Sequence, residues 1–126
     1  MTVNKVLATP FTQINIGKRI AATSALFKEL KSNDICVIQE PLVNKFNRMS
    51  SVPKSHQPIL PYSKERCRVA CVIPKDLYKK TMALGAFASK DSLVLRMRFS
   101  PSITLLVASV YMEDKKPIPS NLISRI

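Results

Sequence analysis

The residues with the clearest chemical potential are an acid, an amide and a phenol, each placed where a predicted strand ends. Glu40 lies at the end of the stretch Asp34–Pro41, whose apolar run is typical of a buried strand. Pro41 cannot extend the strand, because it has no amide hydrogen to donate. Asn15 and Tyr111 lie near the ends of an earlier and a later strand. Since ligands of open α/β sheets bind at the carboxyl ends of strands, we expect Glu40 to meet a hard metal ion or a phosphate.

The elements that position Asn15 and Glu40 follow from hydrophobic periodicity. Residues 11–16 alternate apolar and polar side chains, which predicts a half-buried strand, and Gly17 ends it with a tight turn. Apolar side chains then recur at helical spacing, at Ile20, Thr23, Phe27 and Leu30. A strand, a helix and a second strand in this order form a βαβ unit with parallel strands. Parallel neighbours place Asn15 and Glu40 at the same edge of the sheet.

The rest of the chain predicts one mixed sheet. Residues 1–10 are expected to be a flexible lead-in. Residues 42–66 are expected to be a long loop, because three prolines interrupt this segment and no hydrophobic period is visible in it. We expect strands at 67–73, 92–99 and 103–112, a short helix or turn at 76–82, a polar loop after Tyr111 and the first helical turn at 121–126. The last two strands are joined by a turn at 101–102, which predicts an antiparallel hairpin and therefore a mixed sheet.

Length and charge limit the classes of function. The chain has 126 residues, enough for a single domain, and 20 Lys and Arg against 8 Asp and Glu give a formal charge of +12. Such a surplus favours a polyanionic partner, while the alternatives are a solvated surface or a ribosome-like basic protein. An anionic membrane is disfavoured, since no basic amphipathic helix is visible and the longest apolar run, residues 103–112, is too short to span a bilayer.

The cysteines and the single histidine do not predict a metal site. Cys36, Cys67 and Cys71 lie in apolar stretches, are odd in number and form no CxxC pair. We expect all three to be reduced core residues of an intracellular protein, nuclear or cytoplasmic. His56 is not spaced to complete a zinc site, and we expect it to be an exposed loop residue.

Basic residues near the predicted site suggest contacts with nucleic acid. The 42–66 loop mixes basic side chains with Phe46 and Tyr62, a combination that can hold a phosphate backbone and stack on a base. The candidate contacts are Lys18, Arg19, Lys45, Arg48, Arg66 and Arg68. The alternative is an ordinary exposed loop.

Four segments resemble the endonuclease/exonuclease/phosphatase (DNase I-like) superfamily, and above all the apurinic-type endonuclease domain at the front of non-LTR retrotransposon polyproteins, which also carry a reverse transcriptase. These are residues 13–16 with the helix that follows, 34–41, 68–73 and 107–112. Their order and spacing fit over nearly the whole chain. The resemblance implies an α/β fold, the first half of a four-layer α/β-sandwich, and metal-dependent hydrolysis of phosphodiester bonds in DNA.

The resemblance also implies a role for each candidate residue. Glu40 matches the glutamate that holds a divalent metal, Mg²⁺ or Mn²⁺, and Asn15 matches the asparagine that orients the phosphate or the metal shell. Tyr111 matches the tyrosine that reaches the scissile phosphate. The alternatives are that Asn15 caps the following helix, that Glu40 is a surface acid and that Tyr111 is an aromatic at the edge of the core. No small-molecule cofactor is implied.

Two departures from the family pattern bear on activity. Glu113 and Asp114 stand where many relatives carry proline, so the conformation of that loop differs. The Asp-x-Asn and Ser-Asp-His motifs of the family, which supply the acid–base groups, do not occur after Tyr111. We therefore expect the amino-terminal part of a DNA-nicking endonuclease with little or no activity alone. The alternatives are a catalytically dead module that binds nucleic acid or a partner and, more remotely, a phosphatase of the same superfamily.

The same comparison predicts an incomplete fold. We expect one sheet whose inner face lacks a second sheet to cover it, and therefore a marginally stable chain. The missing second half of the domain, or another partner, is expected to cover that face.

Overall fold

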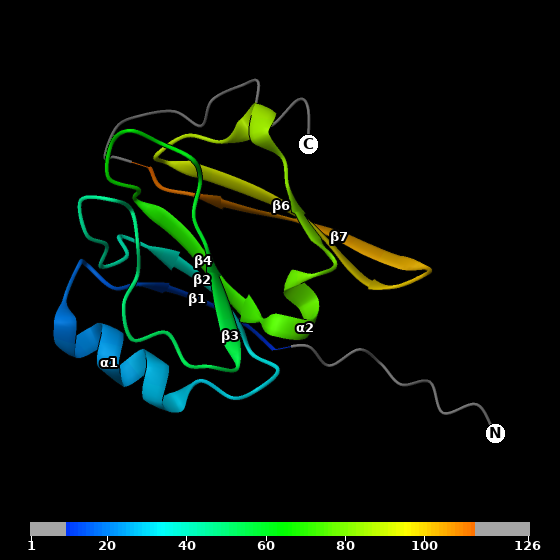
Figure 1. Ribbon diagram of the computed structural model, residues 1–126, viewed down its shortest axis with the longest axis horizontal. Helices are drawn as coiled ribbons and strands as arrows, with labels where there is room; N and C mark the ends of the chain where they lie inside the picture. The colour runs from blue at the N-terminus through cyan, green and yellow to red at the C-terminus, as the bar shows by residue number, and fades with distance from the viewer. Residues whose placement is uncertain (1–9, 113–126) are drawn as a thin grey trace.

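Two β-sheets pack face to face in the computed structural model, which describes residues 10–112 (Figure 1). Sheet A has the order β1 (Phe11–Asn15), β2 (Ile35–Gln39), β4 (Val69–Pro74) and β3 (His56–Ile59). Sheet B has the order β5 (Thr81–Ala83), β6 (Ser92–Ser100) and β7 (Ile103–Val110). The helices are α1 (Ile20–Glu29), α2 (Lys75–Tyr78) and a 3₁₀ turn at Gly85–Phe87. This is the mixed α/β class that the sequence predicted.

The predicted βαβ unit is confirmed. β1 and β2 pair in parallel with Asn15 opposite Gln39, and α1 packs its buried Phe27 against sheet A. Gly17 has a φ of 62°, a left-handed conformation that glycine adopts at little cost, and it turns the chain from β1 towards α1. All five residues of β2 are buried, because α1 covers one face of the strand and sheet B covers the other (Figure 1).

Two apolar clusters hold the layers together. Between the sheets, Ile35, Val37 and Val69 of sheet A meet Leu93 and Leu95 of sheet B. On the other side of sheet A, α1 packs over a second cluster that includes Ile16, Ile38, Val72 and Cys36. Alternating side chains of β2 therefore enter different clusters, as the period of a strand requires.

The expectation of a single sheet with an open inner face is wrong. The hairpin of β6 and β7 is antiparallel as predicted, but with β5 it forms a separate sheet that lies over sheet A. Leu93, Leu95 and Met97 point towards sheet A and are 2% exposed or less. The alternation of β6 was visible in the sequence, but nothing local indicated which sheet would receive its apolar face.

The region expected to be a loop contains a strand. β3 pairs antiparallel with β4 at the edge of sheet A, a position that accepts Pro58 because an edge strand has free amide positions. His56 begins this strand and is only 3% exposed, so the expectation of an exposed loop histidine is also wrong. Its Nε2 donates to the carbonyl oxygen of Asp34 at 2.8 Å, which leaves Nδ1 to accept from the Ser55 hydroxyl at 2.7 Å.

The sandwich is closed on one side and open on the other. The open side is formed by the outer edges of β1 and β7, the terminal strands of the two sheets. Phe11 and Leu105 lie there at positions whose side chains point towards the space between the sheets, yet they are 45% and 40% exposed. A cavity of about 470 Å³ lies between β1, β2 and β7, with Gln13, Val37 and Val107 in its lining. Apolar side chains of the inner sheet faces are therefore exposed along this side.

The remaining expectations have mixed outcomes. Cys36, Cys67 and Cys71 are buried free thiols, as predicted. No helix within residues 10–112 is long and apolar enough to cross a membrane. The expectations for residues 1–9 and 113–126, including the loop at Glu113 and Asp114, lie outside the described part of the chain.

Candidate active site

The parallel pairing of β1 and β2 brings Asn15 and Glu40 to one end of the sandwich. Asn15 lies opposite Gln39, and the carbonyl oxygen of Glu40 accepts a hydrogen bond from the Lys18 amide at 2.9 Å. The Asn15 Oδ1 accepts from the Gly17 amide at 2.9 Å, so this side chain shapes the turn after β1. It does not cap α1, whose N-cap is Arg19 and has no side-chain cap, and that alternative for Asn15 is excluded.

Glu40 has an unusual backbone conformation. Its φ is 51°, a left-handed value that few residues other than glycine adopt, and such strain persists only where the surroundings impose it. The surroundings are two backbone hydrogen bonds: the Glu40 amide donates to the Arg68 carbonyl at 2.9 Å, and its carbonyl accepts from Lys18. The half-buried carboxylate forms no hydrogen bond or ion pair with any residue among 10–112. Strained geometry thus positions a carboxylate that is free to bind a ligand.

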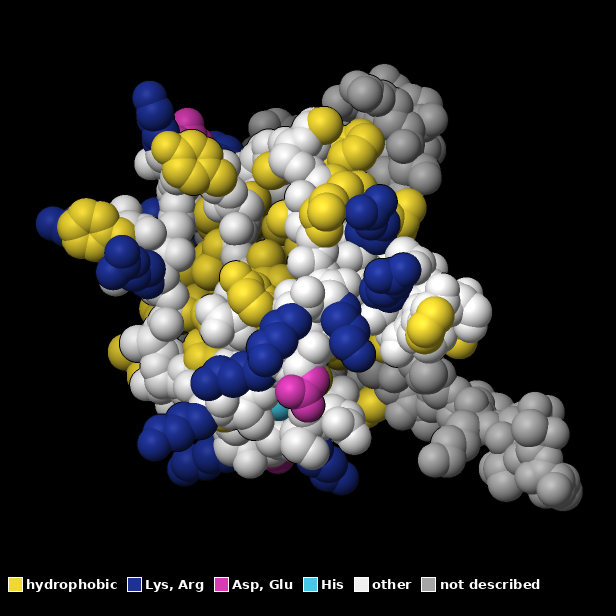
Figure 2. Space-filling model, turned by 45° about the vertical axis from the view of Figure 1, so that its right-hand side comes forward, with side chains coloured by type: hydrophobic (Ala, Val, Ile, Leu, Met, Phe, Trp, Pro, Cys, Tyr) yellow, Lys and Arg dark blue, Asp and Glu magenta, His cyan; other side chains and the backbone are white. Residues whose placement is uncertain are grey.

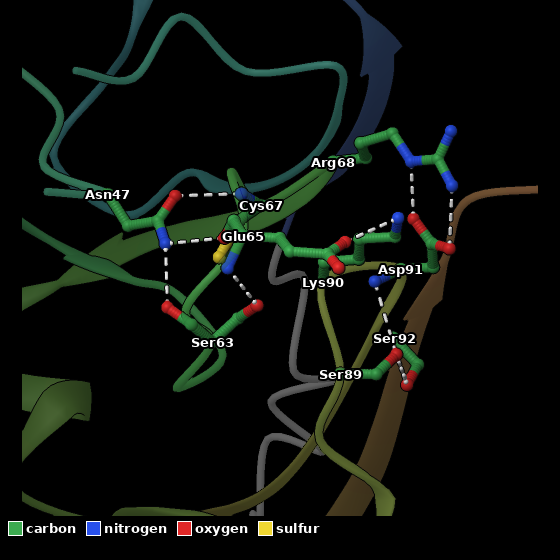
Figure 3. Close-up of polar contacts among 9 residues, drawn as sticks. All are labelled: Asn47, Ser63, Glu65, Cys67, Arg68, Ser89, Lys90, Asp91 and Ser92. Carbon is green, nitrogen blue, oxygen red and sulfur yellow. Dashed lines mark hydrogen bonds and ion pairs between the residues drawn. The ribbon is translucent and has the colours of Figure 1, made fainter. Parts of the chain in front are cut away.

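Arg68 connects the strand of Glu40 to Tyr111. The Arg68 guanidinium binds Asp91 with two hydrogen bonds, from Nε at 2.5 Å and from Nη2 at 2.7 Å (Figure 3). The same guanidinium lies 4.6 Å from the centre of the Tyr111 ring, a cation–π contact. The Tyr111 amide also donates to the Asp91 carbonyl at 2.8 Å. Arg68 therefore fixes Tyr111 at the same end of the sandwich as Glu40.

Sequence reasoning missed Asp91, which lies at the candidate site. It lies in the turn before β6, where no periodic pattern singles out an acid. Its carboxylate is 29% exposed and is engaged by Arg68, whose side chain is 19% exposed. Because Arg68 is held by Asp91 and Tyr111, its guanidinium is less available for nucleic acid than the sequence suggested.

A single asparagine anchors the long 42–66 segment next to this site (Figure 3). Asn47 donates from Nδ2 to the carbonyls of Ser63 at 3.1 Å and Glu65 at 2.8 Å, and its Oδ1 accepts from the Cys67 amide at 2.7 Å. These bonds use both donors of the amide group and its oxygen. Glu65 also forms an ion pair with Lys90, with 2.6 Å between the carboxylate oxygen and the ammonium nitrogen. The hydrogen bond in this pair raises the pKa of Lys90. The loop is thus held in place near Arg68.

The other predicted nucleic-acid contacts are exposed cations. Lys18 and Arg19 follow the turn after β1, while Lys45, Arg48 and Arg66 belong to the anchored segment. Phe46 and Tyr62 are 68% and 91% exposed, which is far more than an aromatic ring needs for a structural role. The Lys45 ammonium lies 5.2 Å from the centre of the Phe46 ring. This combination of exposed charge and exposed rings suits contact with a nucleic-acid strand.

The donors at the Glu40 end suit a weakly held hard cation. Glu40 offers a carboxylate and Asn15 an amide oxygen, and both are ligand types that Mg²⁺ and Mn²⁺ prefer. Residues 10–112 contain no group of three or more His, Cys, Asp or Glu side chains arranged to hold a metal ion. The residues therefore fit a cation that keeps several of its waters, and they do not form a closed protein cage.

The arrangement of two packed sheets, with the site at one end, matches a fragment of an endonuclease fold. A solved structure with this arrangement is the endonuclease domain of TRAS1, a telomere-specific non-LTR retrotransposon, with a TM-score of 0.67 and 21% sequence identity. The match covers 90% of this chain and 51% of that chain, so this chain spans about half the length of that structure. No protein-family model and no curated protein sequence matches the present chain. The likeness establishes the fold, in agreement with the class predicted from the sequence.

Proposed function

We propose that this chain is the amino-terminal part of a divalent-metal-dependent DNA endonuclease domain of the non-LTR retrotransposon type. The observation that carries the proposal is Glu40 at the end of β2, whose backbone is strained and whose carboxylate has no partner among residues 10–112, beside the end of the strand of Asn15 in a fold shared with an endonuclease domain. In this proposal Glu40 and Asn15 hold Mg²⁺ or Mn²⁺, and Tyr111 contacts the scissile phosphate. A divalent cation in such a site neutralises charge that develops on the phosphate and the leaving oxygen.

The residues around the site have separate roles in this proposal. Lys18, Arg19, Lys45, Arg48 and Arg66 contact the DNA backbone, since they are exposed and flank the Glu40 end. Arg68 positions Tyr111, because its guanidinium is bound to Asp91 and stacked on the phenol ring. Activity of the chain alone is low or absent, since the fold neighbour is about twice as long and residues 10–112 contain no group of three or more His, Cys, Asp or Glu side chains that could hold a metal ion.

The same proposal assigns the open side of the sandwich to the rest of the domain. Both terminal strands, β1 and β7, expose their outer edges there, and the apolar Phe11 and Leu105 remain exposed between them. Further strands can form hydrogen bonds with unpaired strand edges and bury exposed apolar surface. A polypeptide that supplies the second half of the fold would add strands to β1 and β7 at once.

Cation binding tests the site without requiring turnover. Titration of the purified chain with Mn²⁺, followed by electron paramagnetic resonance of the free ion, is expected to detect a site that is lost in Glu40→Gln. Glu29→Gln is the matched control, because it removes the same charge from an exposed position on α1. Equal binding by both variants and the unchanged chain would contradict the assignment of Glu40.

A plasmid assay tests the reaction itself. Supercoiled plasmid with Mg²⁺ is expected to be nicked slowly, or only when the second half of the domain is supplied, and Glu40→Gln is expected to abolish nicking.

The second candidate function is a catalytically dead module that binds nucleic acid. It is favoured by the charge of +12 and by the lack, among residues 10–112, of a cluster of acids that could hold a metal ion with Glu40. Salt-sensitive DNA binding, with no nicking and no Mn²⁺ site, would favour that candidate.

A further inference from the structure

A second concentration of positive charge lies away from the Glu40 end, along α2 and the outer face of sheet B. Figure 2 shows Lys and Arg side chains gathered across the middle of this face. Five exposed cations contribute, namely Lys75, Lys79, Lys80, Arg96 and Arg98. None of the five forms an ion pair with another residue in the described part of the chain. No role in the proposed nuclease site accounts for them.

The position of these cations follows from the strand period. β6 alternates, so that Leu95 and Met97 enter the core while Arg96 and Arg98 point to the opposite face of sheet B. The antiparallel pairing places Arg96 opposite Met82 of β5, and an Arg96 Nη2 lies 3.5 Å from the Met82 sulfur. Lys75 of α2 and Lys79 and Lys80, which follow this helix directly, lie beside the same face. The charge is therefore held on a rigid strand and a short helix.

Two adjoining cavities turn this charged face into a groove. The first has a volume of about 630 Å³ and is lined by Lys75, Lys80 and Arg98 together with the apolar Ile35 and Phe99. The second has a volume of about 540 Å³ and is lined by Lys79, Lys80, Arg96 and Arg98, with Thr81 and Thr104. Lys80 and Arg98 line both cavities, so the two lie side by side and share these side chains as a common wall. We call this surface the α2 groove.

The charge balance of the α2 groove is one-sided. Asp76 is the one acid in the lining of the first cavity, and the second cavity has no acid in its lining. The Thr104 hydroxyl also lies among the cations, whereas the hydroxyl of Thr81 already donates to the Leu77 carbonyl at 2.8 Å. Ammonium, guanidinium and hydroxyl groups are the donors that bind successive phosphates. A wall that includes the aromatic ring of Phe99 adds a surface for a base.

We infer that the α2 groove binds a single strand of nucleic acid by its phosphate backbone. Each cavity has the size of a small-ligand site, which suits one nucleotide unit at a time, whereas a duplex presents a wide convex surface. Lys80 and Arg98 belong to both cavities, so they can contact successive phosphates of a strand that passes from one cavity to the other. The inference does not depend on the nuclease proposal, because it uses none of the residues at the Glu40 end.

Salt-dependent binding of labelled oligonucleotides tests the inference. The probes are fluorescein-labelled oligo-uridine RNA and oligo-thymidine DNA of about 12 nucleotides, a length within the range that such grooves cover. The double variant Lys80→Gln/Arg98→Gln is compared with the control Lys28→Gln/Lys31→Gln, which removes two exposed lysines at α1 and just beyond it. Both variants lower the net charge by two, so unspecific attraction changes equally.

The groove variant is expected to weaken binding of a single strand about tenfold and to lower the slope of log K against log salt by about 1.4, or about 0.7 for each lost phosphate contact. The control variant is expected to keep the slope of the unchanged chain. The tighter of the two probes identifies RNA or DNA as the preferred strand. Equal losses in both variants, or no loss in either, would overturn the inference.

Two further measurements keep the result interpretable. Thermal melts establish that each variant is folded, and Lys75→Gln/Arg96→Gln replaces the first groove variant if that one fails to fold. Lys45→Gln/Arg48→Gln, at the Glu40 end, lowers the net charge by the same two units and is expected to weaken single-strand binding less than the groove variant does. If this variant abolishes single-strand binding and the groove variants do not, the strand binds at the Glu40 end and the inference is wrong.

Discussion

β6 and β7 are the two strands of one hairpin, yet they differ sharply in burial. They pair from Ser92–Val110 to Ser100–Ile103, and side chains of both strands face sheet A. Leu95 of β6 is 1% exposed, whereas Leu105 of β7, on the same face, is 40% exposed. The difference follows from the place of each strand in its sheet, because β6 is the central strand of sheet B whereas β7 is a terminal strand beside the open side. Burial in this chain is therefore decided by the opposite sheet and not by the strand's own sequence.

The exception within β7 is the end next to the candidate site. Ser109 is 3% exposed, and its hydroxyl accepts a hydrogen bond from the Gln39 amide at 3.4 Å. Tyr111 follows immediately and is held by Arg68 and Asp91. The site end of the hairpin is thus attached to sheet A, while the rest of β7 forms an open side. The described residues thus position Glu40 although one side of the sandwich is open.

A matched pair of leucine substitutions tests this contrast directly and should give the largest effect. Leu95→Ala is expected to lower the free energy of unfolding by about 3 kcal/mol, because it leaves a cavity between the sheets. Leu105→Ala makes the same chemical change on the same face and is expected to cost less than about 1 kcal/mol, since its side chain already contacts water. Urea denaturation measures both values. Equal costs would show that the open side is covered in solution.

The attachment at the site end is tested by two neighbouring ion pairs. Arg68→Met is expected to cost about 2 kcal/mol, because it removes a bidentate bond and the cation beside Tyr111 and leaves Asp91 without its partner. Lys90→Met removes the more exposed pair with Glu65 and is expected to change the free energy of unfolding far less, because exposed ion pairs contribute little. The ratio of the two costs is read from urea denaturation. A larger cost for Lys90→Met would contradict the role of Arg68 as the link between the sheets.

The buried thiols of sheet A predict how the stability of the chain depends on pH. Burial raises the pKa of Cys71 from 9.0 to about 12 and that of Cys36 to about 11, because a thiolate is poorly solvated there. Above pH 9 the unfolded thiols lose protons that the folded thiols keep, so the free energy of unfolding falls as the pH rises from about 9 towards 11 and 12. Urea denaturation across this range is expected to show the decline, and Cys71→Ala should flatten it. An unchanged slope in Cys71→Ala would show that other groups cause the decline.

The sequence predicted those features that depend on neighbouring residues. The βαβ unit, the β6–β7 hairpin and the meeting of Asn15 with Glu40 follow from periodicity and from the geometry of parallel strands. The second sheet, β3 and the burial of His56 depend on partners far along the chain, and no local pattern reports them. Asp91 was missed for the same reason, since its importance comes from Arg68, which is 23 residues away in sequence.

The open side makes a last prediction, with the smallest effect on stability. No strand among residues 10–112 pairs with the outer edge of β7, and Ile103, Leu105 and Leu106 are each at least 40% exposed, which favours association of one copy of the chain with another. A charge at the edge opposes such association at little cost to the fold, so Leu105→Lys is expected to change the free energy of unfolding by less than about 1 kcal/mol. Sedimentation velocity is expected to show concentration-dependent association of the unchanged chain and a monomer for Leu105→Lys. Ser50→Lys adds the same charge at an exposed loop position and should leave the association unchanged. If the unchanged chain is already a monomer at high concentration, the edge of β7 is protected, and the contrast between the two strands of the hairpin does not extend to association in solution.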